Sequence, residues 1–168
     1  FIGSNFIRMY MKRHADCEIV NLDKLTYAGN LENLREVDSD GRYSFVRGDI
    51  CDRDAVDGAM RGADAVVNFA AETHVDRSIG DCSSFIRTDV QGVHVLLESA
   101  RAQGVGRFIQ VSTDEVYGVA EERPFTEDDR LRPRNPYSAS KAGGDLLALS
   151  YFVTHGFPVM ITRGANSI

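Results

Sequence analysis

The sequence is poor in basic residues and in long apolar runs. It has 19 lysine and arginine residues against 25 aspartate and glutamate residues, so its formal net charge is −6 at pH 7. This balance gives no electrostatic support to nucleic-acid binding, which needs a basic surface. No apolar run reaches the roughly 20 residues that a membrane-spanning helix requires. The rest of the composition, with 43% hydrophobic and 26% charged residues, is typical of one globular domain.

Cysteine and histidine are also scarce, and neither is spaced as in a metal site. Cys17, Cys51 and Cys82 are scattered, and no CxxC pair occurs. An odd number of dispersed cysteines favours reduced thiols in a cytoplasmic protein over a disulfide framework. The four histidines lack metal-ligand spacing, so we expect no metal. No signal peptide is recognisable, and the start of the chain has the character of an interrupted sequence.

Short apolar runs alternate with helical patterns along the chain. The runs predict strands at residues 19–22, 43–46, 65–69, 108–111 and 159–162. The intervening patterns predict helices at residues 5–13, 53–60, 85–102 and 137–154. This alternation favours an α/β fold, a doubly wound and mostly parallel sheet covered by helices on both faces. The polar segment 121–136 is expected to be a long loop beside a site.

The first residues enter a helix with no strand before it. A doubly wound domain begins with a strand and a glycine-rich turn, of which only Gly3 would be present here. The absent strand would lie at the centre of the sheet, between the strands ending near Leu22 and Phe69. Asp23 follows Gly3 by twenty residues, where such folds bind the adenine-ribose hydroxyls, and its charge favours NAD over NADP. Alternatively, Asp23 caps the turn that follows it.

The strongest chemical signal is the YSASK stretch, which places Tyr137 and Lys141 on one face of a helix. A free phenol has a pKa of about 10, too high for a base at neutral pH. A nearby ammonium group favours the phenolate, so this pair can take a proton from a hydroxyl while hydride leaves to NAD. The YxxxK pattern is short, and its value here comes from its combination with Asp23 and the strand–helix alternation.

The stretch VSTDEVYG, residues 111–118, places two hydroxyls and two adjacent acids at the end of a predicted strand. Ligands bind at the carboxyl ends of parallel strands in open α/β sheets. Hydride transfer has a use for Thr113 but not for Asp114 and Glu115. Elimination of water needs both a base and an acid, and two neighbouring carboxyl groups can divide those roles. The alternative is that the two acids point into solvent at a turn.

In these motifs, the chain resembles the extended short-chain dehydrogenase/reductase superfamily, and within it the dTDP-glucose 4,6-dehydratase family. The segments that carry the resemblance are FIGSNF, LDKLTYAGNLENL, GDI, FAAETHVDRSI, STDEVYG, RPRNPYSASKAG and TRGANSI. The resemblance implies that Tyr137, assisted by Lys141 and Thr113, takes the C4 hydroxyl proton of dTDP-glucose as hydride passes to NAD. Glu115 then removes the C5 proton, Asp114 protonates the departing C6 hydroxyl, hydride returns to C6, and C5 is reprotonated. The product would be dTDP-4-keto-6-deoxy-D-glucose.

The same resemblance implies a cofactor path, a substrate site and an assembly. The implied NAD contacts are Phe1, Ile2, Asp23, Lys24, Thr26, Asp49, Ile50, Phe69, Ala70, Ala71, Thr73 and Thr88, with Tyr137 and Lys141. The implied substrate contacts are Thr73, Asp76, Thr113 and Asn166. His74 and Arg77 lie in the same stretch, and we expect a supporting or core role for both. The helices at 85–102 and 137–154 would build a homodimer. Residues 1–168 would form the NAD-binding Rossmann-like domain, incomplete at its start, with the C-terminal substrate domain absent from the fragment.

Some positions depart from the family pattern. Thr73 replaces a serine and keeps the hydroxyl, whereas Gly164 and Ala165 replace a more usual Cys-Ser pair and Ser167 replaces an asparagine. Two alternative functions remain open: an NAD-dependent nucleotide-sugar epimerase or decarboxylase on the same fold, which does not need the acid pair, and a non-catalytic NAD-binding module, which does not need Tyr137 or Lys141. We expect the 168-residue chain alone to be poorly stable, because unpaired strand edges would be exposed.

Overall fold

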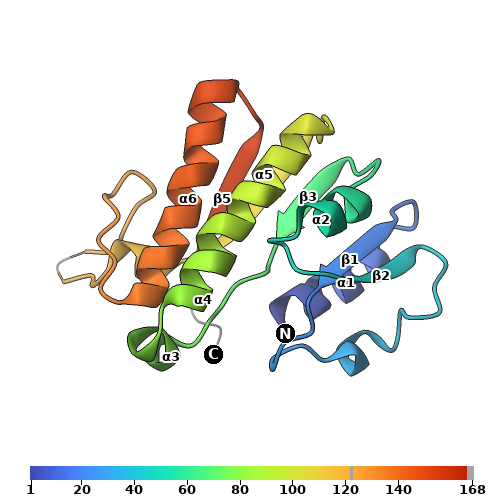
Figure 1. Cartoon of the computed structure of the whole chain (residues 1–168), viewed down its shortest axis with the longest axis horizontal. Helices are drawn as coiled ribbons and strands as arrows, with labels where there is room; N and C mark the ends of the chain where they lie inside the picture. The colour runs from blue at the N-terminus through green and yellow to red at the C-terminus, as the bar shows by residue number, and fades with distance from the viewer. Residues whose placement is uncertain (122, 166–168) are drawn as a thin grey trace.

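In the computed structural model, which describes residues 1–121 and 123–165, five parallel strands form two sheets (Figure 1). One sheet pairs β1 with β2, and the other has the order β3-β4-β5. The strands are β1 (Ile19–Asp23), β2 (Tyr43–Arg47), β3 (Ala65–Asn68), β4 (Arg107–Thr113) and β5 (Val159–Gly164). All five predicted strands are confirmed, with ends that differ by at most two residues. The α/β class and the parallel pairing are confirmed as well.

In the described residues, no strand pairs β1 with β3, so the two sheets are separate. The division falls between the strands that end near Leu22 and Phe69, where the sequence predicts a central strand to be absent. Helix α1 (Ile2–Arg13) packs beside this division, with Phe6 against Phe69 at 5.2 Å between ring centroids. A Cβ added to Gly3 would lie 3.4 Å from the Phe69 side chain, so the start of α1 lies close to the end of β3.

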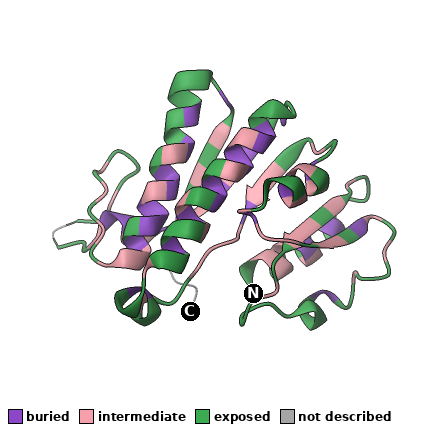
Figure 2. Cartoon of the chain, in the orientation of Figure 1, coloured by how far each residue is buried: buried purple, intermediate pink, exposed green. Residues whose placement is uncertain are grey.

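Each sheet has its own hydrophobic core. The larger core joins the second sheet to α2 (Arg53–Ala59), α5 (Val93–Ala102) and α6 (Pro136–His155), and its fully buried members include Val56, Leu97 and Phe108. The smaller core joins Ile7 and Met11 of α1 to the first sheet. Figure 2 shows that the buried residues of α5 and α6 lie along the facing sides of these helices. The apolar periodicity of residues 85–102 therefore reports real packing, as the sequence predicts.

The predicted helix at 85–102 is present, but it is not a uniform α-helix. It consists of a short turn, α4 (Ser83–Phe85), a seven-residue π-helical segment, η2 (Ile86–Gly92), and α5. The sequence also does not predict α3 (Val75–Gly80) or the 3₁₀ turns η1 (Leu31–Leu34) and η3 (Asp114–Tyr117). These elements are too short to show a helical period. None of the helices in the described part of the chain combines the length and apolar character that a membrane span needs.

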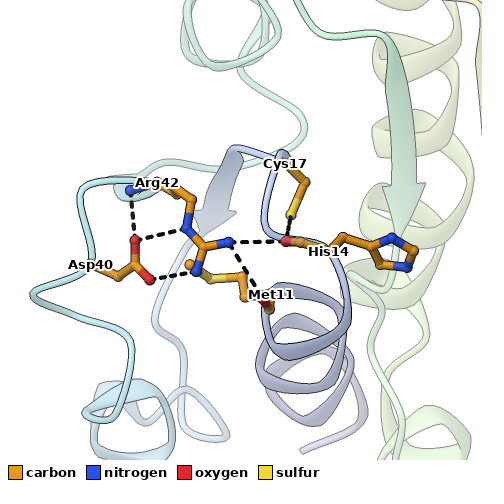
Figure 3. A network of polar contacts seen from close by, with 5 residues as sticks. All are labelled: Met11, His14, Cys17, Asp40 and Arg42. Atoms are coloured by element: carbon orange, nitrogen blue, oxygen red, sulfur yellow. Dashed lines mark hydrogen bonds and ion pairs between the residues drawn. The ribbon is translucent and has the colours of Figure 1, made fainter.

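The carboxyl end of α1 is tied to the first sheet by the Arg42 side chain (Figure 3). Its guanidinium group donates hydrogen bonds to the carbonyl oxygens of Met11, at 3.4 Å, and His14, at 2.9 Å. Asp40 holds the same guanidinium group with both carboxylate oxygens, at 3.1 and 2.7 Å. The Cys17 thiol also donates to the His14 carbonyl. Arg42 thus satisfies carbonyl groups that lack partners within the helix.

The turn after η3 depends on a glycine. Gly118 has φ 93° and ψ −133°, a conformation that residues with a side chain rarely adopt. A Cβ at this position would lie 2.6 Å from the carbonyl oxygen of Arg132. The Arg132 amide donates to the Val116 carbonyl at 2.9 Å, so the two ends of the intervening loop meet beside η3. The loop predicted at 121–136 is confirmed up to Asn135, where α6 is capped.

Substituting Gly118 with alanine should therefore cost more stability than the same change at Gly156. Gly156 also has positive φ, 61°, but nothing lies within 4 Å of its added Cβ. We expect Gly156→Ala to lower the free energy of unfolding by about 1 kcal/mol and Gly118→Ala by at least about 2 kcal/mol. Denaturant unfolding of both variants measures the difference. Equal losses would show that the contact with Arg132 costs nothing.

Candidate active site

The polar residues at the end of β4 are held against the start of α6. Thr113 ends β4 and caps the following 3₁₀ turn, η3. Its Oγ1 atom accepts a hydrogen bond from the Glu115 amide at 3.2 Å. Asn135 caps α6 by accepting from the Ser138 amide at 2.7 Å, and Pro136 follows at the first helical position. The sequence therefore encodes both turns locally, and together they bring residues 113–115 beside residue 137.

Each of the two adjacent acids has its own neighbour. The Thr113 hydroxyl donates to Asp114 Oδ1 at 3.3 Å. The Asn135 Nδ2 group donates to Glu115 Oε2 at 3.2 Å. Both acids are partly buried rather than fully solvated. They therefore differ in environment, a condition for dividing the roles of acid and base.

Tyr137 and Lys141 lie one turn apart on α6, facing the end of β4. The Lys141 side chain is only 4% exposed, and its Nζ donates to the Val111 carbonyl at 2.8 Å. Tyr137 is half-buried, its amide donates to the Ser78 hydroxyl at 3.1 Å, and its ring lies edge-on to Phe85. Ser78, in α3, was not predicted from the sequence, because nothing about an isolated serine indicates such a contact.

The sequence predicts that Lys141 favours the phenolate of Tyr137, but the net shift of the Tyr137 pKa in the protein alone is upward. Burial raises the pKa of Tyr137, and the nearby carboxylates, Glu115 foremost, raise it further, against a hydrogen bond with Thr113 that lowers it. Burial also lowers the pKa of Lys141. The protein residues alone therefore do not favour the phenolate. Further positive charge beside the ring is required for Tyr137 to act as a base.

A second group of predicted residues gathers at the carboxyl end of the first sheet. Asp23 ends β1, and its Oδ1 accepts from the Leu25 amide at 2.7 Å, so it does cap the following turn, as the alternative interpretation holds. The Asp23 side chain is nevertheless exposed, which leaves it accessible to a ligand. Lys24 pairs with Asp49 at 2.7 Å. Burial would raise the pKa of Asp49, but hydrogen bonds from Lys24 and the Cys51 amide outweigh it and lower that pKa.

Other predicted cofactor contacts differ in accessibility. Phe1, Ile2, Thr26 and Thr73 are exposed, and Phe69, Ala70, Ala71 and Thr88 are partly buried. The Ala70 amide donates to Asn68 Oδ1 at 3.1 Å, and Asn68 is fixed in turn by Gln110 of β4 at 3.0 Å. Ile50 is different, because its side chain lies in the larger core, where a Cβ on Gly92 would lie 2.5 Å from it. Its side chain therefore has a packing role.

A cavity of about 440 Å³ lies beside the predicted substrate residue Asp76. It is lined by Tyr27, His74, Val75, Asp76 and Arg77. The Arg77 guanidinium group lies 4.1 Å from the centre of the Tyr27 ring, which joins the loop after β1 to α3. The sequence assigns His74 and Arg77 supporting roles, and this position is compatible with them. Asn166 lies outside the described residues.

Asp89, in the π-helical segment, was not predicted from the sequence. It is 1% exposed and accepts from the Ser140 hydroxyl at 2.7 Å and the Glu72 amide at 3.1 Å. Burial raises the pKa of Asp89 from 3.8 to about 6, which corresponds to about 3 kcal/mol of lost stability when it is charged. Since the folded protein binds this proton more tightly than the unfolded chain, the free energy of unfolding falls as the pH rises towards 6.

A buried ion pair fixes the opposite side of η3. Asp145 of α6 is 1% exposed, and its Oδ2 accepts from Arg163 Nε of β5 at 2.9 Å. Arg163 also donates to the Tyr117 hydroxyl of η3 at 2.5 Å. Burial raises the pKa of Asp145, and the Arg163 charge opposes this rise. Asp145 follows Lys141 by four residues and so lies on the same face of the helix, which could have indicated that it is buried.

Comparison with known proteins places the chain among nucleotide-sugar enzymes. The family described as GDP-mannose 4,6 dehydratase matches residues 1–167. The low-salt glycan biosynthesis protein Agl12 of Haloferax volcanii is 53% identical over 99% of this chain and 54% of its own length. The dTDP-glucose 4,6-dehydratase of Streptomyces niveus is 50% identical over 99% of this chain and 51% of its own.

A solved structure supports the same grouping. The dTDP-glucose 4,6-dehydratase DesIV of Streptomyces venezuelae, determined with NAD bound, superposes with a TM-score of 0.93 at 51% identity. The match covers 97% of this chain and 52% of DesIV. The chain therefore spans about half the length of the relatives it matches.

Removing the Arg163 guanidinium group should strongly destabilise the protein. In Arg163→Ala, Asp145 would be a buried carboxylate without its counter-ion, and we expect a loss of about 3–5 kcal/mol in the free energy of unfolding. Arg53→Ala is the matched control, because Arg53 pairs with Asp57 on the exposed surface of α2 and should matter little. Urea unfolding of both variants compares them, and similar losses would contradict a special role for the buried pair.

Proposed function

We propose, since this chain belongs to the family described as GDP-mannose 4,6 dehydratase, that the intact protein is an NAD-dependent nucleotide-sugar 4,6-dehydratase acting on dTDP-glucose. The observation that carries the proposal is the meeting of two chemical pairs at the end of β4. Tyr137, with Lys141, provides the base that takes a hydroxyl proton during hydride transfer. Asp114 and Glu115 provide an acid and a base. A dTDP sugar is favoured by relatives of about 50% identity that carry this name.

The residues along the carboxyl ends of β1 and β3 fit NAD. The exposed Asp23 carboxylate suits the hydroxyls of an adenine ribose and would repel a 2′-phosphate. Lys24 and Asp49, which pair with each other, and Thr26 would border the adenosine. Phe1 and Ile2, at the start of α1, would approach the pyrophosphate, where the positive end of the helix favours a phosphate. Phe69, Ala70, Ala71, Thr73 and Thr88 would line the path to Tyr137.

When bound, NAD supplies a reversible hydride store and a positive ring. A positive ring would supply the charge that Tyr137 lacks, because burial and Glu115 raise the pKa of its phenol in the protein alone. Tyr137 would then take the proton of the sugar C4 hydroxyl, with Thr113 donating a hydrogen bond to that oxygen. Lys141 would stabilise the phenolate.

Dehydration needs two further proton movements after C4 has become a ketone. Glu115, oriented by Asn135, would remove the C5 proton, which the ketone makes acidic. Asp114, beside the Thr113 hydroxyl, would protonate the departing C6 hydroxyl as water leaves. The stored hydride would then return to C6 and a proton to C5, so that no NADH accumulates. Thr73, Asp76 and Asn166 would contact the substrate. An epimerase or decarboxylase of the same fold has no use for this acid pair.

The apolar surface of α6 supports a homodimer. Leu146, Leu149 and Val153 are exposed at intervals of three and four residues, so they form one stripe, and Phe152 extends it. Four large apolar side chains exposed together on one helix indicate a contact surface, whereas single exposed apolar residues do not. A second copy of the protein, meeting this helix and the 83–102 helix, would cover them. The free thiols of Cys17, Cys51 and Cys82 fit a cytoplasmic location.

The central test is Glu115→Gln in the intact protein with NAD and dTDP-glucose. We expect the parent to form a 4-keto-6-deoxy product with no net NADH, and the variant to lose at least about 10²-fold in product formation while NADH accumulates. NADH absorbance and product analysis measure the two steps separately. Glu127→Gln, an exposed acid in the loop, should behave as the parent.

Tyr137→Phe should give neither NADH nor product, since the first proton cannot be removed. UDP-glucose and GDP-mannose, tested alongside, distinguish the nucleotide. Dehydration by Glu115→Gln at the parent rate would overturn the assignment of the base. Failure of the parent to act on any of the three nucleotide sugars would overturn the function.

Leu149→Glu should convert the dimer to a monomer, because it buries a charge in the centre of the α6 stripe. Sedimentation equilibrium measures the mass of each form. Val119→Glu, at an exposed apolar residue that is not on α6, should leave the dimer intact. A parent protein that sediments as a monomer at all concentrations would refute the dimer.

A further inference from the structure

The buried carboxylate of Asp89 has no part in the proton steps described above. It lies in the π-helical segment, whose wider turn brings it against α6. Its carboxylate joins three elements, because Ser140 of α6 and the Glu72 amide after β3 both donate to it. The backbone is equally close, since a Cβ on Gly144 would lie 2.5 Å from the Asp89 carbonyl oxygen. Packing alone does not require a charge at such a buried position.

Lys141 is the cation whose charge needs support. It is buried, and in the described part of the chain its ammonium group hydrogen-bonds a neutral carbonyl, that of Val111. A buried lysine without a nearby negative charge tends to lose its proton. Asp145, one turn away, is already engaged by Arg163. Asp89, bonded to Ser140 next to Lys141, favours the charged form of Lys141 more than Asp145 does.

We propose that Asp89 is a positioning residue that keeps the ammonium group of Lys141 protonated inside the protein, and this rests on the proposed function of Lys141 beside Tyr137. Asp89 touches neither the sugar nor the reacting phenol. It acts on Lys141 by its charge, while the Ser140 hydroxyl donates a hydrogen bond to its carboxylate. Burying the Asp89 carboxylate lowers the stability of the protein, and in return the Lys141 ammonium group stays charged at the pH at which the enzyme works.

The other charges around this pair fix the sign of the effect. Burial and the Glu72 carboxylate raise the pKa of Asp89, while Ser140, Lys141 and the Glu72 amide lower it. Burial lowers the pKa of Lys141, and Asp89 and then Asp145 raise it. Neutralising residue 89 should therefore cause Lys141 to lose its proton at a lower pH.

The direct effect on the phenol has the opposite sign. Tyr137 faces Glu115, Asp89 and Asp114, each of which raises its pKa. Removing the charge at residue 89 does not by itself hinder ionisation of the phenol. The loss of activity should consequently be confined to the alkaline side of the pH profile, where Lys141 would be neutral.

The test is Asp89→Asn, which keeps the shape and removes the charge. The parent Asp89 is protonated below pH about 6, so parent and variant should have the same kcat/KM there. On the alkaline side the variant should lose about tenfold, because its alkaline limb moves to lower pH. Ser140→Ala removes a hydrogen bond to Asp89 but keeps the charge, and its alkaline limb should not move.

A second measurement does not depend on activity. In the intact protein, the side-chain NMR signal of Lys141 can be assigned by its loss in Lys141→Arg. Its titration midpoint in Asp89→Asn should lie below that of the parent, even if no nucleotide sugar proves to be a substrate. An unchanged midpoint, or an equal loss of activity at every pH, would overturn the proposal. Asp89→Ser serves for both measurements if Asp89→Asn does not fold.

Discussion

The site depends on one contact, the docking of the polar face of α6 on the carboxyl end of β4. Lys141 reaches the Val111 carbonyl of that strand, and Asn135, at the start of the helix, holds Glu115 just beyond it. Because one rigid helix carries both the Tyr–Lys pair and the clamp on the acid pair, the relative position of the two pairs is set by helix geometry rather than by a flexible loop. A helix of 20 residues with a side-chain cap and an initial proline is a firm base for such an arrangement.

That docking is unusually polar for a buried interface. Ser138, Ser140, Lys141 and Asp145 are all buried on α6, where a stable helix would ordinarily place aliphatic residues. Asp89 and Arg163 meet this face from η2 and β5. Each charge lowers stability on burial, yet each is paired or hydrogen-bonded. The interface therefore sacrifices stability for a fixed pattern of charge, and the apolar core around Leu97 and Phe108 offsets the loss.

The sequence was sufficient for the strands because they are short apolar runs, and for α6 because the Asn-Pro start and the YxxxK spacing coincide. It was also sufficient to bring Thr113, Asp114 and Glu115 to the same sheet edge as Tyr137. It did not reveal α3 or the π-helical turn, since neither has a long enough period. The pKa direction of Tyr137 could not be read from the spacing, because burial depends on Phe85, Ser78 and other residues distant in sequence. Asp89 lies four and eight residues before the buried residues Val93 and Leu97, and this helical spacing could have indicated that it is buried.

The short contact between Gly118 and the Arg132 carbonyl has a consequence for how this protein can vary. The chain leaves η3 and returns to it at almost the same point, fastened there by the amide of Arg132 on Val116. The residues between these anchor points are not all independent of η3, because the Phe125 ring stacks on Tyr117 at 5.1 Å between ring centroids and Leu131 packs on the same apolar cluster. A recognition peptide or a fluorescent reporter grafted into this loop would have to leave Phe125 and Leu131 in place, and the exposed residues Glu127 and Asp128 between them offer the position for it.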